Sequence, residues 1–171
     1  MTSLSTQKTP SSSLFSYLTP QRRYDVFLNF RGGDTRKNFS DHLYAALEMN
    51  GVVTFRDDEE MVGGSSVGLQ LKKVLEESMF AIVILSRNYA SSTWCLRELQ
   101  MIFSCKRETG MRILPIFYDV NPSDVRNQRG HFGGDFIRQE MRFEDNIEQV
   151  QTWRAALTDV TNLRAWNSTY Q

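Results

Sequence analysis

The sequence predicts a single α/β domain in which parallel strands alternate with helices. From Tyr24 onward, short runs of apolar, β-branched and aromatic residues alternate with longer amphipathic stretches, the pattern of successive β-α-β units. The chain has 171 residues, 40% of them hydrophobic, which is enough for one core without disulfides or a structural metal. Its 20 basic and 20 acidic residues balance, which argues against nucleic acid or an acidic membrane as the partner.

Four strands are expected from the apolar runs. The third run, Phe-Ala-Ile-Val-Ile-Leu, is apolar throughout, which is typical of a central strand covered on both faces. Pro115 removes a hydrogen-bond donor from the fourth strand, which favours a place near an edge or a bulge. In chain order the expected strands are Tyr24–Phe30, Val52–Asp57, Phe80–Ser86 and Arg112–Tyr118.

Helices are expected between these strands and after the last one. The first has Asp34 or Thr35 as its cap and ends at Asn50-Gly51, with a core stripe of Phe39, Leu43, Ala46 and Leu47. The second, Val67–Glu77, follows an acidic, glycine-containing loop. Ser91, Ser92 or Thr93 caps the third, Trp94–Arg107. The last, about Ile147 to Leu163, presents Val150, Trp153, Leu157 and Val160 on one side.

Residues 1–23 differ in composition from the rest of the chain. Ten of the first twenty residues are Ser or Thr, which predicts a disordered leader, with a transit peptide as the alternative. Cys95 and Cys105 fall on one predicted helix about 15 Å apart along its axis, too far for a disulfide. Together with His42 and His131 they lack the paired spacing of a zinc site, so no metal is expected.

Ligands of open parallel sheets bind beyond the carboxyl ends of the strands, so the loops there are the first candidates for a site. Trp94 and Glu98 stand four residues apart just after the central strand and share one helix face. An aromatic ring beside a carboxylate suits a ribose-containing ligand, because the carboxylate can stabilise an oxocarbenium-like centre or attack it. The competing interpretation is a packed Trp beside a solvated acid.

Three other features have weaker functional interpretations. Arg31 and Arg36 flank two glycines before a helix start, which could present donors to a phosphate but is also ordinary turn chemistry. The acidic loop that begins at Asp57 is most simply solvated. Cys95 would need a base to act as a nucleophile, and neither His42 nor His131 is adjacent in the sequence.

Several motifs, in order, resemble the plant Toll/interleukin-1 receptor (TIR) domains of intracellular immune receptors. The resemblance implies a flavodoxin-like fold with a five-stranded parallel sheet flanked by helices on both faces, the fifth strand lying near Arg164 to Asn167. It implies a leader at 1–23, a TIR domain at 24–168 and a tail at 169–171. The motifs are Tyr24-Asp25-Val26-Phe27-Leu28, Phe30-Arg31-Gly32, Asp34-Thr35-Arg36, His42-Leu43-Tyr44, Asn88-Tyr89-Ala90-Ser91-Ser92, Trp94-Cys95-Leu96, Glu98-Leu99, Pro115-Ile116-Phe117-Tyr118, Pro122-Ser123-Asp124-Val125-Arg126 and Trp153-Arg154-Ala155-Ala156-Leu157.

The resemblance also implies an activity. Plant TIR domains cleave NAD at the nicotinamide-ribose bond when they self-associate, and the nucleotide products signal cell death. By this resemblance Glu98 is the catalytic residue, and Trp94, Arg31 and Gly32 line the nucleotide site. NAD+ or NADP+ is then a substrate, and no cofactor is expected. The implied location is cytoplasmic, with the nucleus as an alternative.

The expected partners are other copies of the domain or other TIR domains. The loop from Asp57 to Ser66, with Asp57 and Asp58, resembles the flexible loop that packs neighbours head to tail. Relatives usually have Arg-Gly where this chain has Gly63-Gly64, which removes a charge and adds backbone freedom. His42, with neighbours on the first and last helices, matches the self-association surface. Asp41 beside it places an acid where two copies of one helix meet, and like charges there oppose the contact.

Of two functions other than the enzyme, one fits the sequence and one does not. A non-catalytic TIR module that assembles receptors or adaptors without turnover stays open. A phospho-accepting receiver domain of similar topology does not fit, because that chemistry needs an Asp at the end of the third strand, where this chain has Ser86-Arg87.

Overall fold

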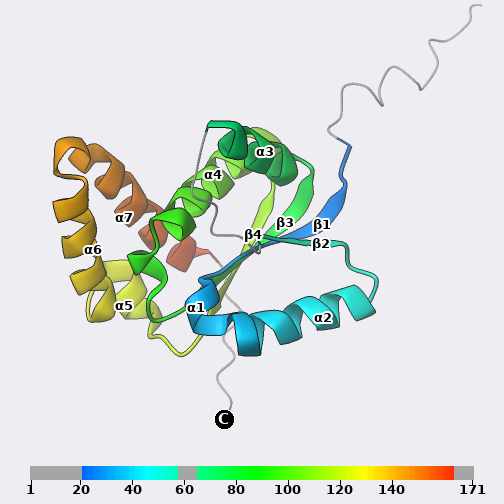
Figure 1. Cartoon of the computed structure of the whole chain (residues 1–171), viewed down its shortest axis with the longest axis horizontal. Coiled ribbons are helices and arrows are strands. Elements are labelled where there is room, and N and C mark those ends of the chain that lie inside the picture. The colour runs from blue at the N-terminus through cyan, green and yellow to red at the C-terminus, as the bar shows by residue number, and fades with distance from the viewer. Residues whose placement is uncertain (1–20, 58–64, 164–171) are drawn as a thin grey trace, which may run out of the picture.

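The computed structural model describes residues 21–57 and 65–163. Their four strands form one parallel sheet in the order β2-β1-β3-β4, which agrees with the flavodoxin-like order. Each expected strand is confirmed to within two residues at either end. The bounds are Tyr24–Asn29 for β1, Thr54–Arg56 for β2, Ser78–Leu85 for β3 and Arg112–Phe117 for β4 (Figure 1). The expected fifth strand, most of the leader and the tail lie outside the described residues.

Strand β3 occupies the centre of the sheet, as its continuous apolar run predicts. It pairs with β1 on one side and with β4 on the other. Ala81, Val83 and Leu85 point into the larger core, whereas Ile82 and Ile84 point into a smaller core on the opposite face. Pro115 lies opposite Val83 on β4, which is the last strand of the described sheet. Whether β4 is the edge of the whole sheet depends on the expected fifth strand, which lies outside the described residues.

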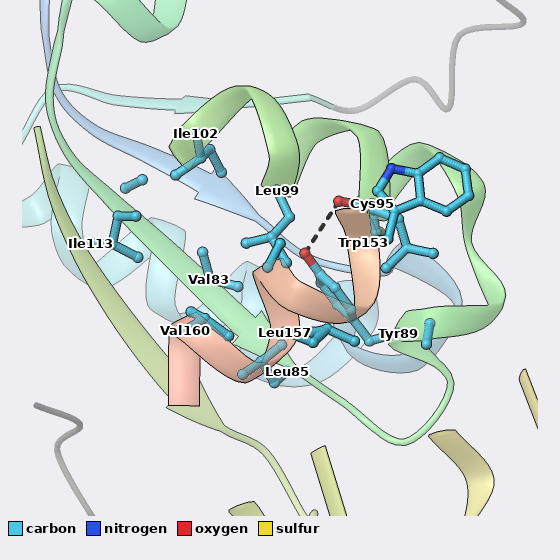
Figure 2. Close-up of a cluster of buried hydrophobic side chains, with 14 of the residues drawn as sticks. Val83, Leu85, Tyr89, Cys95, Leu99, Ile102, Ile113, Trp153, Leu157 and Val160 are labelled. Atoms are coloured by element: carbon cyan, nitrogen blue, oxygen red, sulfur yellow. Dashed lines mark hydrogen bonds between the residues drawn. The ribbon is translucent and has the colours of Figure 1, made fainter. Parts of the chain in front are cut away.

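Three of the expected helices cover the larger core. They are α3 (Ser65–Glu76), α4 (Thr93–Thr109) and α7 (Ile147–Asn162). Ser92 is the cap of α4, since its side chain accepts a hydrogen bond from the Cys95 amide at 3.1 Å. The four predicted core residues of α7 are fully buried, and Trp153, Leu157 and Val160 pack against β3 and α4 in Figure 2.

The first crossover departs from the prediction of one regular helix. It consists of α1 (Gly32–Thr35), a π-helical segment η2 (Arg36–Ser40) and α2 (Asp41–Met49). Neither Asp34 nor Thr35 caps a helix with its side chain. Arg31 precedes α1 and Thr35 precedes η2, both without a side-chain cap, and the Asp34 side chain has other partners. Ala46 is exposed, so the core stripe is narrower than predicted. Phe39, Leu43 and Leu47 do pack on the smaller core.

Two helices beyond β4 were not predicted. They are α5 (Pro122–Asn127) and α6 (His131–Arg142), and the short segments η3 (Tyr89–Ser91) and η4 (Glu144–Asn146) complete the described elements. The pair Gly133-Gly134 obscures the pattern of α6. A methyl group at Gly133 would lie 2.9 Å from the Gln128 carbonyl oxygen, so the close approach of the two segments needs a glycine. None of the described helices is long and apolar enough to cross a membrane.

Candidate functional site

The candidate site lies beyond the carboxyl ends of β1 and β3. The crossovers that leave these neighbouring strands pack on opposite faces of the sheet, because α2 lies on the smaller core and α4 on the larger one. Such a switch point leaves an opening between the loops, and ligands of open α/β sheets bind there. The loops after β1, β2 and β3 come together at this point, as the sequence predicts.

Glu98 is the buried acid of this site. Its side chain projects from the second turn of α4, and the residue is only 3% exposed. Asn29, the last residue of β1, donates from Nδ2 to Glu98 Oε2 at 3.1 Å. Glu98 Oε1 has no hydrogen-bond partner among the described residues. The interpretation of Glu98 as a solvated acid is therefore wrong, since a surface acid has neither this burial nor an unpaired oxygen.

The surroundings of Glu98 favour its neutral form. Burial raises the pKa of the carboxyl to about 8, because the low-dielectric interior penalises the charged form. The hydrogen bond from Asn29 lowers the pKa and offsets part of this rise, and the nearby negative charge of Asp57 adds to it. The Trp94 indole also lowers the pKa, by less than Asn29 does. An acid with a strongly shifted pKa in a pocket is a mark of a functional site.

Trp94 and Asp57 close the pocket over Glu98. The indole Nε1 of Trp94 donates to Asp57 Oδ2 at 3.1 Å. The cavity that remains is about 10 Å³, no more than one water molecule needs. Asp57, expected at an interface, is thus also part of the pocket. The residues that line it are Leu28, Phe30, Gly32, Arg36, Asp57, Trp94, Cys95 and Glu98.

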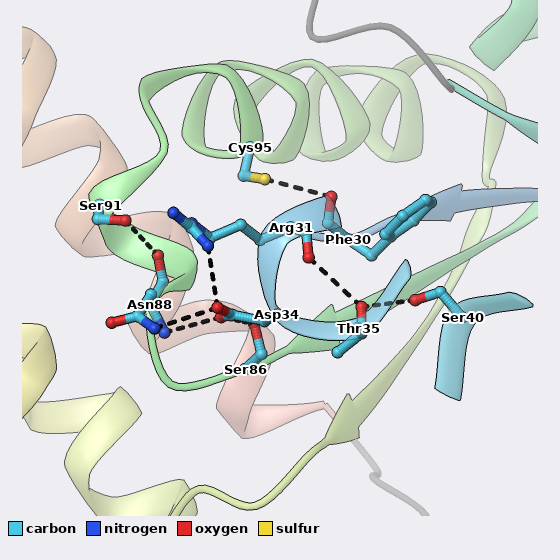
Figure 3. Close-up of polar contacts among 9 residues, drawn as sticks. All are labelled: Phe30, Arg31, Asp34, Thr35, Ser40, Ser86, Asn88, Ser91 and Cys95. Carbon is cyan, nitrogen blue, oxygen red and sulfur yellow. Dashed lines mark hydrogen bonds and ion pairs between the residues drawn. The ribbon is translucent and has the colours of Figure 1, made fainter. Parts of the chain in front are cut away.

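A second carboxylate, Asp34, fastens the first loop to the loop after β3 (Figure 3). Its Oδ2 accepts from Ser86 Oγ at 2.6 Å and from the Asn88 amide at 3.0 Å. Its Oδ1 accepts from Asn88 Nδ2 at 3.1 Å and from Arg31 Nη1 at 2.9 Å. Burial alone would raise the pKa of Asp34, but these donors and the Arg31 charge outweigh it and hold the pKa below its usual value.

Arg31 and Gly32 line a larger cavity next to the Glu98 pocket. It has a volume of about 660 Å³ and shares Gly32 and Arg36 with that pocket. Arg31, Arg36 and Lys37 give it a positive lining, because its one acid, Asp34, already pairs with Arg31. A cationic cavity of this kind suits a phosphate-bearing ligand. The structure thus brings Arg31, Gly32, Trp94 and Glu98 into adjoining pockets.

The expected self-association residues are only partly described. His42 is exposed on α2. Asp41 forms an ion pair with Arg56, whose guanidinium also lies 4.4 Å from the centre of the Tyr44 ring. Asp58, Gly63 and Gly64 lie outside the described residues. The last helix described, α7, packs on the larger core, whereas α2, which carries His42, packs on the smaller one.

The loop after β4 does not join the Glu98 pocket. It lines a separate cavity of about 230 Å³ together with Arg87 and the start of α6. Arg87 Nε donates to His131 Nε2 at 2.7 Å, and both residues line this cavity. Position at the carboxyl end of the sheet is thus not enough to predict membership of the site, because β4 lies one strand away from the switch point.

Three residues of the site were not predicted: Asn29, Asp34 as an anchor, and Tyr89. The sequence holds one signal for Asn29, which is a polar residue directly after the apolar run Val26-Phe27-Leu28; it is fully buried. Asp34 and Tyr89 carry no such local signal. Their roles depend on contacts with residues more than fifty positions away in the chain.

Comparisons with known proteins agree with this arrangement. Residues 23–171 match the family model of the TIR domain. The chain is 49% identical over 141 residues to TMV resistance protein N of Nicotiana glutinosa, and 45% identical over 167 residues to disease resistance protein RPV1 of Vitis rotundifolia. These matches cover 82% and 98% of this chain but 12% of each relative, so the chain spans about an eighth of their length.

A solved structure is similar over most of the domain. It is that of the TIR domains in the activated Roq1 resistosome, which directly recognises the pathogen effector XopQ. The two chains are 46% identical, with a TM-score of 0.77, and the match covers 86% of this chain and 90% of the other.

Proposed function

Since the chain belongs to the TIR domain family, with plant disease resistance proteins as relatives, we propose that it cleaves NAD+ or NADP+ at the nicotinamide-ribose bond when copies self-associate. The products would then act as nucleotide signals for cell death in plant immunity. The observation that carries the proposal is Glu98, a buried carboxyl with one unpaired oxygen beside an aromatic ring.

The proposed chemistry needs one carboxylate and one water molecule. As the bond between the ribose carbon and the nicotinamide nitrogen breaks, its electron pair leaves with nicotinamide, which becomes neutral. Positive charge develops on the ribose, and ionised Glu98 stabilises it through Oε1 or bonds to it transiently. Water then adds to the ribose carbon and releases a proton. The products are nicotinamide and ADP-ribose, or its 2′-phosphate from NADP+.

The small size of the Glu98 pocket supports the proposal that the domain is inactive until the pocket opens. A cavity of about 10 Å³ cannot admit a nicotinamide ring, so Trp94 and Asp57 must separate before the substrate reaches Glu98. If contacts between copies stabilise the open state, activity follows the degree of association. The Roq1 TIR domains belong to an assembled resistosome, which supports self-association as the trigger.

The test is nicotinamide release from NAD+ and NADP+ by the chain clustered on a multivalent carrier. Glu98→Gln removes the carboxylate with little change of shape, and Glu108→Gln makes the same change at an exposed position of the same helix. We expect release from the parent chain and from Glu108→Gln, and a loss of at least about 100-fold for Glu98→Gln. Equal rates for all three would exclude Glu98 as the catalytic residue.

The same closed pocket favours a second candidate, a TIR module that assembles partners without turnover. This candidate predicts concentration-dependent association in light scattering with no loss of NAD+ at any concentration or degree of clustering. Association accompanied by nicotinamide release would exclude it.

A further inference from the structure

We propose that Asn29 and Tyr89 are positioning residues for Glu98, which hold one carboxylate oxygen in place and leave the other free for the substrate. The inference rests on the proposed function, and it concerns residues outside the Trp94 and Glu98 motif. Its basis is a hydrogen-bonded chain of fully buried side chains that connects β1, η3 and α4.

Tyr89 is the anchor of this chain. Its ring is fully buried in the larger core, and its hydroxyl donates to Asn29 Oδ1. The same hydroxyl lies 3.2 Å from the Cys95 carbonyl oxygen, in the first turn of α4 (Figure 2). Tyr89 thus connects the end of β1 to the turn that precedes Glu98.

Cys95 adds a second connection between the same elements. Its thiol lies 3.4 Å from the carbonyl oxygen of Phe30, the residue after Asn29 (Figure 3). The start of α4 is therefore held to the end of β1 by two contacts, one through Tyr89 and Asn29 and one through Cys95 and Phe30. Because both elements are fixed, Glu98 has little freedom to move away from Asn29.

Tyr89 also decides which way the Asn29 amide faces. A hydroxyl that donates to Asn29 needs the amide oxygen on its side, so the amide nitrogen must face Glu98. The nitrogen can only donate, and it holds Glu98 Oε2 at 3.1 Å. Oε1 is left without a hydrogen-bond partner among the described residues, and Glu98 is one of the residues that line the pocket. One oxygen thus fixes the orientation and the other is available for chemistry.

Four other ionisable or charged groups surround Glu98. Asp57 follows β2, Arg36 comes from the first crossover, Cys95 lies on α4, and the Tyr89 hydroxyl stands behind Asn29. Of the groups that act on the pKa of Glu98, the Asn29 amide is the strongest that favours the ionised form. Removing its hydrogen bond should therefore raise the pKa further.

The experiment compares three variants of the clustered chain across pH. Asn29→Leu removes the donor at similar volume, and Tyr89→Phe removes only the hydroxyl. The control Ser78→Ala removes a buried hydroxyl that bonds to the Val74 carbonyl oxygen at the amino end of β3, away from the site. We measure kcat/KM for nicotinamide release, whose pH profile reports the free enzyme.

We expect the rising limb of the profile to move to higher pH by about one unit in Asn29→Leu, which lowers kcat/KM about tenfold at pH 7. Tyr89→Phe should move it in the same direction by about half as much, because the amide loses its fixed orientation but keeps its donor. Ser78→Ala should leave the midpoint unchanged. A loss of rate at all pH values with no shift in midpoint would mean that both residues are merely structural.

A second measurement does not depend on activity. The Glu98 carboxyl can be titrated by ¹³C NMR in glutamate-labelled chain, with Glu98→Gln to identify its signal. A raised midpoint in Asn29→Leu and Tyr89→Phe supports the positioning role even if no variant releases nicotinamide, in which case only the proposed function fails. An active parent chain with unshifted Glu98 midpoints in both variants would overturn the positioning role and leave the function standing.

Discussion

Two carboxylates at the same end of the sheet, Asp34 and Glu98, are held in opposite ways. Asp34 accepts four hydrogen bonds, one of them from a guanidinium, and its pKa lies below the usual value. Glu98 accepts a hydrogen bond on one oxygen, from Asn29, and burial raises its pKa to about 8. Asp34 is therefore a structural anchor, whereas Glu98 is an acid that the fold leaves incompletely satisfied.

The two carboxylates therefore affect the stability of the folded chain in opposite directions. An ionised carboxylate with a full set of donors stabilises the loops that it connects. A buried carboxyl with an unpaired oxygen destabilises the native state whenever the pH favours ionisation. Residues that lower stability in this way persist mainly at sites of function, which is why Glu98 and not Asp34 is the candidate for chemistry.

The largest expected effect is a gain of stability in Glu98→Gln. The unfolded chain ionises Glu98 from pH 4.5 upward, whereas the folded chain keeps the proton up to about pH 8. Raising the pH through this window therefore destabilises the folded chain, by about 3 kcal/mol at pH 7. The amide has no such cost, so urea denaturation should show Glu98→Gln to be more stable at pH 7 and equal to the parent near pH 4. Equal stability at both pH values would contradict the raised pKa.

The second effect has the opposite sign and the opposite pH dependence. Asp34→Asn removes the negative charge of the carboxylate that accepts hydrogen bonds from Arg31, Ser86 and Asn88. The substitution should lower the free energy of unfolding by about 2 kcal/mol at pH 7. Since the folded pKa is lowered, the contribution of Asp34 is present above pH 3.8 and is lost as the pH falls through the folded pKa. Urea denaturation at pH 7 and pH 3 measures this. If the parent and Asp34→Asn differed in free energy of unfolding by the same amount at both pH values, the charge of Asp34 would not be what stabilises the loops.

A smaller effect is expected at the contact that closes the pocket. Asp57→Ala removes the acceptor of the Trp94 indole and a negative charge near Glu98. The pKa of Glu98 should fall by less than about one unit, and the Trp94 indole proton should exchange with solvent at least about tenfold faster. Indole NMR signals report the exchange, and the fully buried Trp153 is the internal reference. Unchanged exchange at Trp94 would show that Asp57 does not keep the pocket closed.

The sequence alone predicts the strands of the sheet and the position of Glu98 on its helix, but not the partners of Glu98 and Asp34. Continuous apolar runs predict β1 to β4, and the spacing of Trp94 and Glu98 places both on one helix face. These features are local, so periodicity and capping rules reveal them. The burial of Glu98, its partner Asn29 and the donors of Asp34 depend on which strands become neighbours. Capping preferences favour Asp34 at a helix start. Its actual partners are Ser86 and Asn88, which come close to it only when β1 and β3 pair in the folded sheet.

A third carboxylate, Asp41, gives the smallest effect. Its side chain is 45% exposed and pairs with Arg56, so it has neither the full donor set of Asp34 nor the burial of Glu98. Asp41→Ser should change the free energy of unfolding by less than about 1 kcal/mol, because solvent screens an exposed ion pair. The pairing also reduces the like-charge repulsion expected between two copies of α2. Light scattering should therefore show a change in self-association of less than about threefold for Asp41→Ser, or under 1 kcal/mol. A much stronger association would mean that Arg56 fails to neutralise the acid at the contact.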